Sequence, residues 1–240
     1  MNPSDKLKSI QDHLYTSEDG DQYTIELLGG MKSKEIQNLK NSLPNQYLPP
    51  EIEELLTFSK GFIFNELDEI RFDAFGYFGF EEVFPYSIQL AGDGFGNFWI
   101  LDIDSEGNWK EVYYVGHDPA VIVKHSENLS QFIAHIDEFG IAGENSHLAT
   151  IHDQAVYQIW NEESGMMEDD TGSYLFETPK ELPESYWIAN LKDKPIGTGF
   201  AWGKFGHGAE IVRPGDDPIW VIEKKKRQGF FYKLFGLGKR

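Results

Sequence analysis

The fold is decided by residues 92–103, which read Gly92-Asp93-Gly94-Phe95-Gly96-Asn97-Phe98-Trp99-Ile100-Leu101-Asp102-Ile103. The first six residues combine glycine with Asp and Asn, which is typical of a tight turn. The others are apolar at almost every position, as in a central strand that is covered on both faces. A nucleotide-binding glycine loop needs a helix after its glycines. Because a strand follows here, dinucleotide binding is excluded.

Further elements lie on both sides of this stretch. Residues 104–108 read Asp-Ser-Glu-Gly-Asn and predict a hairpin connection, after which 112–115 return antiparallel. Additional strands are expected at 88–91 and 120–123. A pair of helices is predicted from Ser33 and Pro50, and a closing helix after Asn128. This order does not alternate strand and helix, so the sequence predicts an α+β fold with a mostly antiparallel sheet.

The sequence indicates four parts in the chain. Residues 1–29 are expected to be a polar, loosely held lead-in with a short strand at 23–28, and residues 30–141 form the main domain. Residues 142–222 predict a smaller β-rich C-terminal extension. Its expected strands lie at 186–191, 199–202, 210–212 and 219–222, whereas 148–160 fits either a helix or a strand. Residues 223–240 form a basic, aromatic tail.

Charge is distributed unevenly along the chain. Its 240 residues include 40 acidic and 21 basic side chains, a net charge of −19. Seven of the basic residues lie in 224–240, where no acid occurs, so residues 1–223 carry a net charge of −26. Such a body repels phosphates, which argues against direct binding of nucleic acid. It suits either solubility alone or an anionic surface that attracts a basic partner protein.

The expected location is the cytoplasm. The chain has no cysteine, its first residues are polar without a signal-peptide core, and no stretch approaches the roughly 18 apolar residues of a membrane span. The tail adds a second hypothesis, because its aromatic residues can line one helical face between cations, as in a membrane-surface anchor. The alternatives are contact with the acidic body, capture of a partner, and disorder of the terminus. The residues concerned are Lys224, Lys225, Lys226, Arg227, Phe230, Phe231, Lys233 and Phe235.

The sequence predicts no catalytic residue, metal site or cofactor. Its seven histidines form neither His-x-x-x-His nor His-x-His, and neither a Gly-x-Ser-x-Gly elbow nor a phosphate-binding P-loop occurs. Asp102, Asp104 and Glu106 resemble the start of a calcium loop, but Tyr113 stands where that loop needs a glutamate. Asp102 and Asp104 share one strand face, which leaves an acid–base pair as a hydrolase hypothesis. A strand end and a turn residue that meet water are the more common explanation of such a pair.

Several segments together resemble the SUKH superfamily, which includes Smi/Knr-type cell-wall-synthesis regulators and many bacterial toxin-immunity proteins. The resemblance covers about residues 30–141 and leaves 142–222 and the tail unassigned. It implies two helices before a sheet, a closing helix, and a non-enzymatic protein-binding function. The segments that carry it are Leu43-Pro44, Leu48-Pro49, Ser59-Lys60-Gly61-Phe62, 92–102, 112–118 and 128–133.

Two functions are expected from these observations. The first is a cytoplasmic SUKH-type protein that binds another protein, in particular a toxin-immunity protein that occludes a basic toxin domain. Its expected partner-binding residues lie at the sheet end and in the turns, where recognition residues concentrate. These are Asp93, Asn97, Asp102 and Asp104. The alternative is a peripheral cell-envelope or cell-wall-synthesis regulator that contacts the membrane through the basic tail.

Overall fold

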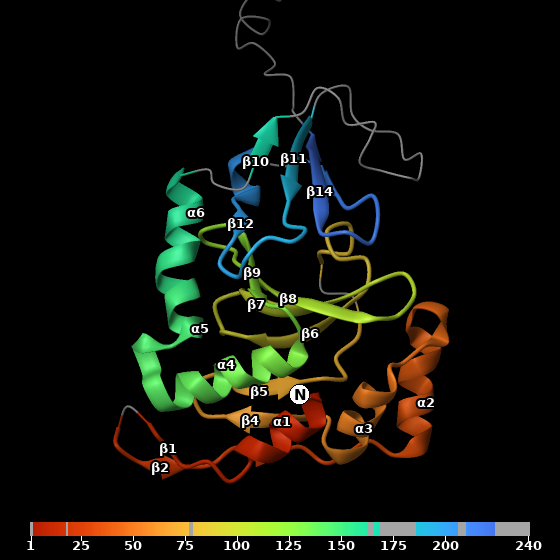
Figure 1. The fold of residues 1–240 in the computed structure, drawn as a ribbon, viewed down its shortest axis with the longest axis vertical. Helices are drawn as coiled ribbons and strands as arrows, with labels where there is room; N and C mark the ends of the chain where they lie inside the picture. The colour runs from red at the N-terminus through yellow and green to blue at the C-terminus, as the bar shows by residue number, and fades with distance from the viewer. Residues whose placement is uncertain are drawn as a thin grey trace, which may run out of the picture.

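A computed structural model describes residues 2–17, 19–76, 79–162, 166–168, 186–205 and 210–223. Its helices and antiparallel sheets make an α+β fold, which confirms the predicted fold class (Figure 1). Within these ranges, no helix has both the length and the apolar character needed to cross a membrane.

A five-stranded sheet with the order β12–β9–β8–β7–β6 lies at the centre. Trp99 and Leu101 of β7 pack into a larger core, whereas Ile100 packs into a smaller one on the other face. The strand is therefore covered on both faces, as its apolar run predicts. The five strands are β6 (Ser87–Gly92), β7 (Phe98–Ile103), β8 (Trp109–Val115), β9 (Ile122–Ser126) and β12 (Gly199–Phe200).

Two smaller sheets lie on the N-terminal side (Figure 1). One has the order β3–β4–β5, and the other is the pair β1–β2. Leu27 lies in β3, so the short strand predicted at 23–28 is present in shortened form. Their bounds are β1 (Tyr15–Thr16), β2 (Gln22–Tyr23), β3 (Glu26–Leu27), β4 (Gly61–Phe64) and β5 (Asp68–Arg71).

Three helices come from the first 58 residues: α1 (Pro3–Ile10), α2 (Ser33–Ser42) and α3 (Pro50–Phe58). The last two are the predicted helix pair, joined by the short turn η1 (Pro44–Gln46). The prediction of a loosely held lead-in is wrong for α1. Asn2 caps this helix, and the side chains of Leu7 and Ile10 are fully buried against α3 and α4. Packing of two apolar residues three positions apart therefore outweighs the polarity of the segment.

The closing helix and a second helical segment follow β9. The side chain of Asn128 accepts a hydrogen bond from the backbone of Gln131 at 3.0 Å, which confirms the predicted start of α4 (Leu129–Ala142). After the turn η2 (Gly143–Asn145), the chain continues through α5 (His147–Thr150), the π-helical turn η3 (Ile151–Ala155) and α6 (Val156–Glu162). The ambiguous stretch 148–160 is therefore helical.

The C-terminal strands form a four-stranded sheet with the order β10–β11–β14–β13. Between it and the central sheet lies the smaller core, where Phe200 and Tyr113 contact Trp220. The extension also supplies β12 to the central sheet and the short turn η5 (Trp202–Phe205). Apart from Glu223, the predicted tail lies outside the described residues. The strands are β10 (Met166–Glu168), β11 (Tyr186–Asn190), β13 (Ile211–Val212) and β14 (Ile219–Glu223).

Candidate functional site

The structure places the four predicted binding residues at opposite ends of β7. Asp93 and Asn97 form the turn before the strand, where Asp93 accepts hydrogen bonds from the backbones of Phe95 at 2.9 Å and Asn97 at 3.2 Å. The Asn97 side chain also accepts a bond from the backbone of His117 at 2.7 Å. These bonds give both residues a role in the turn and present Phe95 at its tip, 85% exposed.

The other two predicted residues are buried at the far end of β7. Asp102 accepts a hydrogen bond of 2.7 Å from the guanidinium of Arg213, and both side chains are almost wholly inaccessible. Burial raises the pKa of Asp102 to about 6, although Arg213 acts in the opposite direction. Asp104 closes the hairpin by accepting bonds from Asn108. The four residues therefore do not form one exposed surface.

We predict that Asp104→Ala lowers the free energy of unfolding by about 1–3 kcal/mol at neutral pH, because the partly buried backbone donors of Glu106 and Asn108 lose their acceptor. Burial alone would raise the pKa of Asp104, but hydrogen bonds from Asn108 and Lys110 lower it below its ordinary value. A depressed pKa stabilises the folded state above the unfolded value of ~4, and this gain is lost as pH falls through the folded pKa.

Urea unfolding of wild type and Asp104→Ala across this pH range checks the prediction. The difference between the free energies of unfolding of wild type and Asp104→Ala is expected to become smaller in acid. Glu106→Ala is the matched control, since Glu106 is exposed in the same hairpin. A loss of stability that does not change with pH, or that equals the loss caused by Glu106→Ala, contradicts a stabilising role for the Asp104 carboxylate.

A cluster of histidines and a glutamate, which sequence reasoning missed, lies where α4 meets α5. His135 and Glu138 are three residues apart on α4 and therefore share one face of the helix. His147 is the first residue of α5, which Ser146 caps by accepting a bond from Ala149 at 3.2 Å. Suitable ligand atoms of these three side chains all lie within 4.8 Å of one another.

Direct contacts hold the cluster together. Nδ1 of His147 lies 2.7 Å from one carboxylate oxygen of Glu138 and 3.0 Å from the other. The ring of His147 is stacked on that of His135, with centroids 5.1 Å apart and an interplanar angle of 7°. Burial and the neighbouring His147 lower the pKa of His135, so its ring is neutral at physiological pH.

A second layer of polar side chains from β9 lies beneath the cluster. Ser126 is fully buried, and its hydroxyl lies 3.2 Å from Nδ1 of His135 and 2.8 Å from Nδ1 of His125. Burial lowers the pKa of His125 to about 3, so this ring is neutral as well. The buried layer therefore fixes the orientation of His135.

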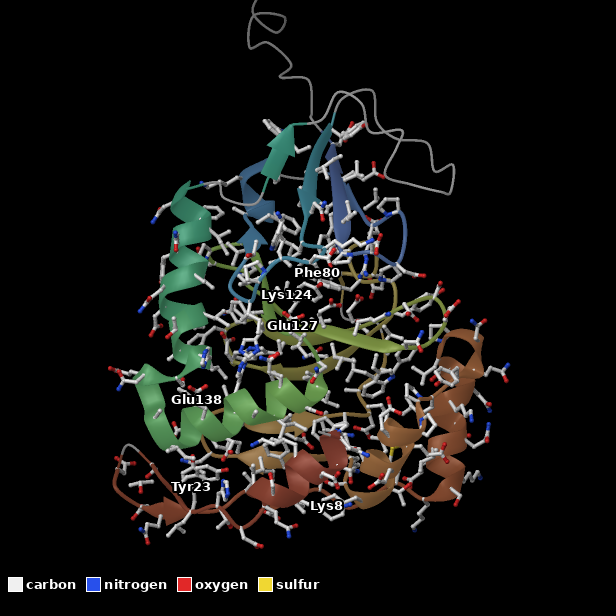
Figure 2. The ribbon with its side chains drawn as sticks, in the orientation of Figure 1. Lys8, Tyr23, Phe80, Lys124, Glu127 and Glu138 are labelled. Atoms are coloured by element: carbon white, nitrogen blue, oxygen red, sulfur yellow. The ribbon has the colours of Figure 1, made fainter. Side chains whose placement is uncertain are left out.

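The cluster opens into a groove of about 1060 Å³ that α4, the segment α5–η3–α6 and the loop before β12 enclose. Figure 2 shows Glu127 beside the start of α4 and Glu138 nearer its end. Glu127 and Glu138 are the charged residues among the described ones that line the groove, and neither lysine nor arginine is present there. The other lining residues are Gln131, Ala134, His135, His147, Thr150, Ile151, Gln154, Ala155, Gln158 and residues 195–198.

One further signal of a functional surface is the π-helical turn. Ile151, Gln154 and Ala155 of η3 line the groove. Such turns are rare and frequently mark functional sites, because they change the direction in which side chains point without ending the helix.

Sequence reasoning missed this site because its members are dispersed. His125, His135 and His147 are separated by a strand end, a helix and a turn, so no short motif connects them. The spacing His135-x-x-Glu138 on a predicted helix was the available signal. No family model, curated protein or solved structure matches the chain.

Proposed function

We propose that this protein is a non-enzymatic, intracellular binding protein of the SUKH type, and that its groove receives a cationic segment of a partner protein. The observation that carries the proposal is the lining of the groove, with Glu127 and Glu138 and without a described lysine or arginine. Lys124 pairs with Glu127 at 2.7 Å, so Glu138 contributes most of the net negative charge of the groove.

The charge of the whole chain supports the same partner class. Residues 1–223 carry a net charge of −26, which attracts a basic protein over distances longer than a single contact. A groove of this size accommodates several side chains, and its mixture of Ile, Ala, Gln and Thr suits a polypeptide segment. Occlusion of a basic toxin domain, the role of an immunity protein, is the function that this surface and the sequence resemblance suggest together.

Where the adjoining gene encodes a toxin domain, we predict that Thr150→Lys/Gln154→Lys weakens binding of that domain by about tenfold or more, because the new cations repel the partner. Both residues are exposed and line the groove. The experiment uses an inactivated form of the toxin domain and isothermal titration calorimetry. In parallel, cells that co-express the active toxin with the variant are expected to lose protection.

The matched control is Gln37→Lys/Asn41→Lys. It adds the same charge at two exposed positions four residues apart, on α2. We expect a change of about twofold at most from this control, since only the long-range attraction weakens. Equal losses from both variants would refute the groove as the contact surface. An adjoining toxin that is neither bound nor neutralised would refute the immunity role.

A further inference from the structure

The cluster in the groove has the composition of a transition-metal site. His135 and His147 offer imidazole nitrogens and Glu138 offers a carboxylate, the donor types that Zn²⁺ accepts in sites with three protein ligands. Among the residues that the structure describes, this trio is the group of three potential ligands that lie close enough together to hold an ion. We propose that His135, Glu138 and His147 bind one Zn²⁺ ion.

The buried layer beneath the cluster prepares His135 as a ligand. A serine hydroxyl can accept a hydrogen bond from one imidazole while it donates to another. In one of the two proton arrangements, Ser126 accepts from Nδ1 of His135 and donates to Nδ1 of His125, which leaves a lone pair on Nε2 of His135. This arrangement places the proton of His125 on Nε2, a buried atom that has no hydrogen-bond partner among the described residues. Metal-binding histidines are typically held in this way through the second ring nitrogen.

The exposed members of the trio can adjust to the ion. Ligands about 2.1 Å from a tetrahedral zinc lie about 3.4 Å from one another. The present ligand atoms are within 4.8 Å of one another, close to that spacing. The ring of His147 is stacked parallel to that of His135, so it must also turn until its in-plane lone pair points at the ion. The side chains of His147 and Glu138 are 65% and 35% exposed and can make these shifts, while Ser126 holds His135.

The contact between His147 and Glu138 marks the place of the ion. Nδ1 of His147 and the carboxylate oxygen of Glu138 are 2.7 Å apart, a hydrogen-bond distance. A zinc ion bound by both groups would take the place of this hydrogen bond, with His135 as the third ligand. All three side chains line the groove, so a fourth coordination position faces its opening and is accessible to water or to a donor atom of a bound molecule.

A zinc ion held by Glu138 would make the groove less negative and so weaken its attraction for a cationic segment. The metal is therefore tested on the full chain alone, without the partner. We expect titration of metal-free, tag-free protein with ZnCl₂ to show saturable binding of one ion per chain at this site. His147→Gln and Glu138→Gln are expected to lower the affinity by more than about 100-fold, and Ser126→Ala by about 10–100-fold as an outer-layer residue. Co²⁺ in place of zinc is expected to give the intense visible absorption of a tetrahedral site, and His147→Gln to abolish it.

His152→Ala is the matched control, since His152 is half exposed, contacts a carboxylate at 3.1 Å and lies outside the cluster. It is expected to bind zinc as the wild type does. His147 and Glu138 are on the surface, so their variants keep the fold, which circular dichroism verifies. Absence of saturable binding, or equal weakening by His152→Ala and His147→Gln, overturns the proposal. Zinc binding without partner binding would leave this site standing and refute only the proposed function.

Discussion

Arg213→Ala is expected to lower the free energy of unfolding by about 3–5 kcal/mol, the typical cost of removing one partner from a buried ion pair. Arg213 donates to Asp102 at 2.7 Å, and both side chains are almost inaccessible. Its guanidinium also donates to the backbone carbonyls of Asp217, at 2.9 Å, and Asp216. Loss of the cation leaves the carboxylate of Asp102 buried without its counter-charge.

Urea unfolding at neutral pH measures the effect. Lys192→Ala is the control, because Lys192 pairs with Asp217 at 2.9 Å where both side chains are about half exposed. Solvent screens such a pair, so no measurable change is expected from its loss. Asp102→Leu/Arg213→Met is expected to be more stable than Arg213→Ala, since neither charge then remains buried alone. If Arg213→Ala behaves like Lys192→Ala, the pair is not essential to the fold.

Phe200→Ala is the second large effect, with an expected loss of about 3–5 kcal/mol from the cavity that it leaves. Phe200 is 0% exposed on β12 and contacts Trp220 of the C-terminal sheet, with ring centroids 5.3 Å apart. The smaller core joins this sheet to the central one. One cooperative unfolding transition at a lower urea concentration is therefore expected, with loss of both sheets together.

Phe95→Ala provides the matched control. Phe95 is 85% exposed at the tip of the 92–97 turn, so its truncation is expected to change stability by less than about 0.5 kcal/mol. Two separate transitions for Phe200→Ala, as tryptophan fluorescence and circular dichroism would report, would show that the C-terminal strands fold as an independent unit.

Periodicity and turn chemistry predict most of the fold. The run 98–103 indicates a strand covered on both faces, and the structure places its alternate residues in two different cores. Asn128 and Gln131 mark the start of α4 through a local hydrogen bond, so neighbouring residues are sufficient to predict it. The helix α1 was missed because its formation depends on packing against α3 and α4, which the sequence of the segment does not show.

The candidate site is less predictable for a related reason. Asp102 and Asp104 lie at the predicted hairpin connection 104–108, where exposed recognition residues were expected. Asp102 instead pairs with Arg213, 111 positions away, and this contact buries it. His135 and His147 are 12 positions apart and form stacked rings because the chain reverses between α4 and α5. Tertiary packing determines the direction of that reversal, so no pattern in the neighbouring sequence predicts that the two rings meet.

Hydrogen exchange of the full chain, alone and with the inactivated form of a basic toxin domain that it binds, tests most directly whether the groove is the partner-binding surface. We expect slower exchange on binding in residues 131–138, 147–155 and 195–198, which enclose the groove. Exchange in α2 is expected to stay unchanged. Slower exchange in the 92–97 turn alone, or no slower exchange in any part of the chain, would show that the partner does not bind in the groove.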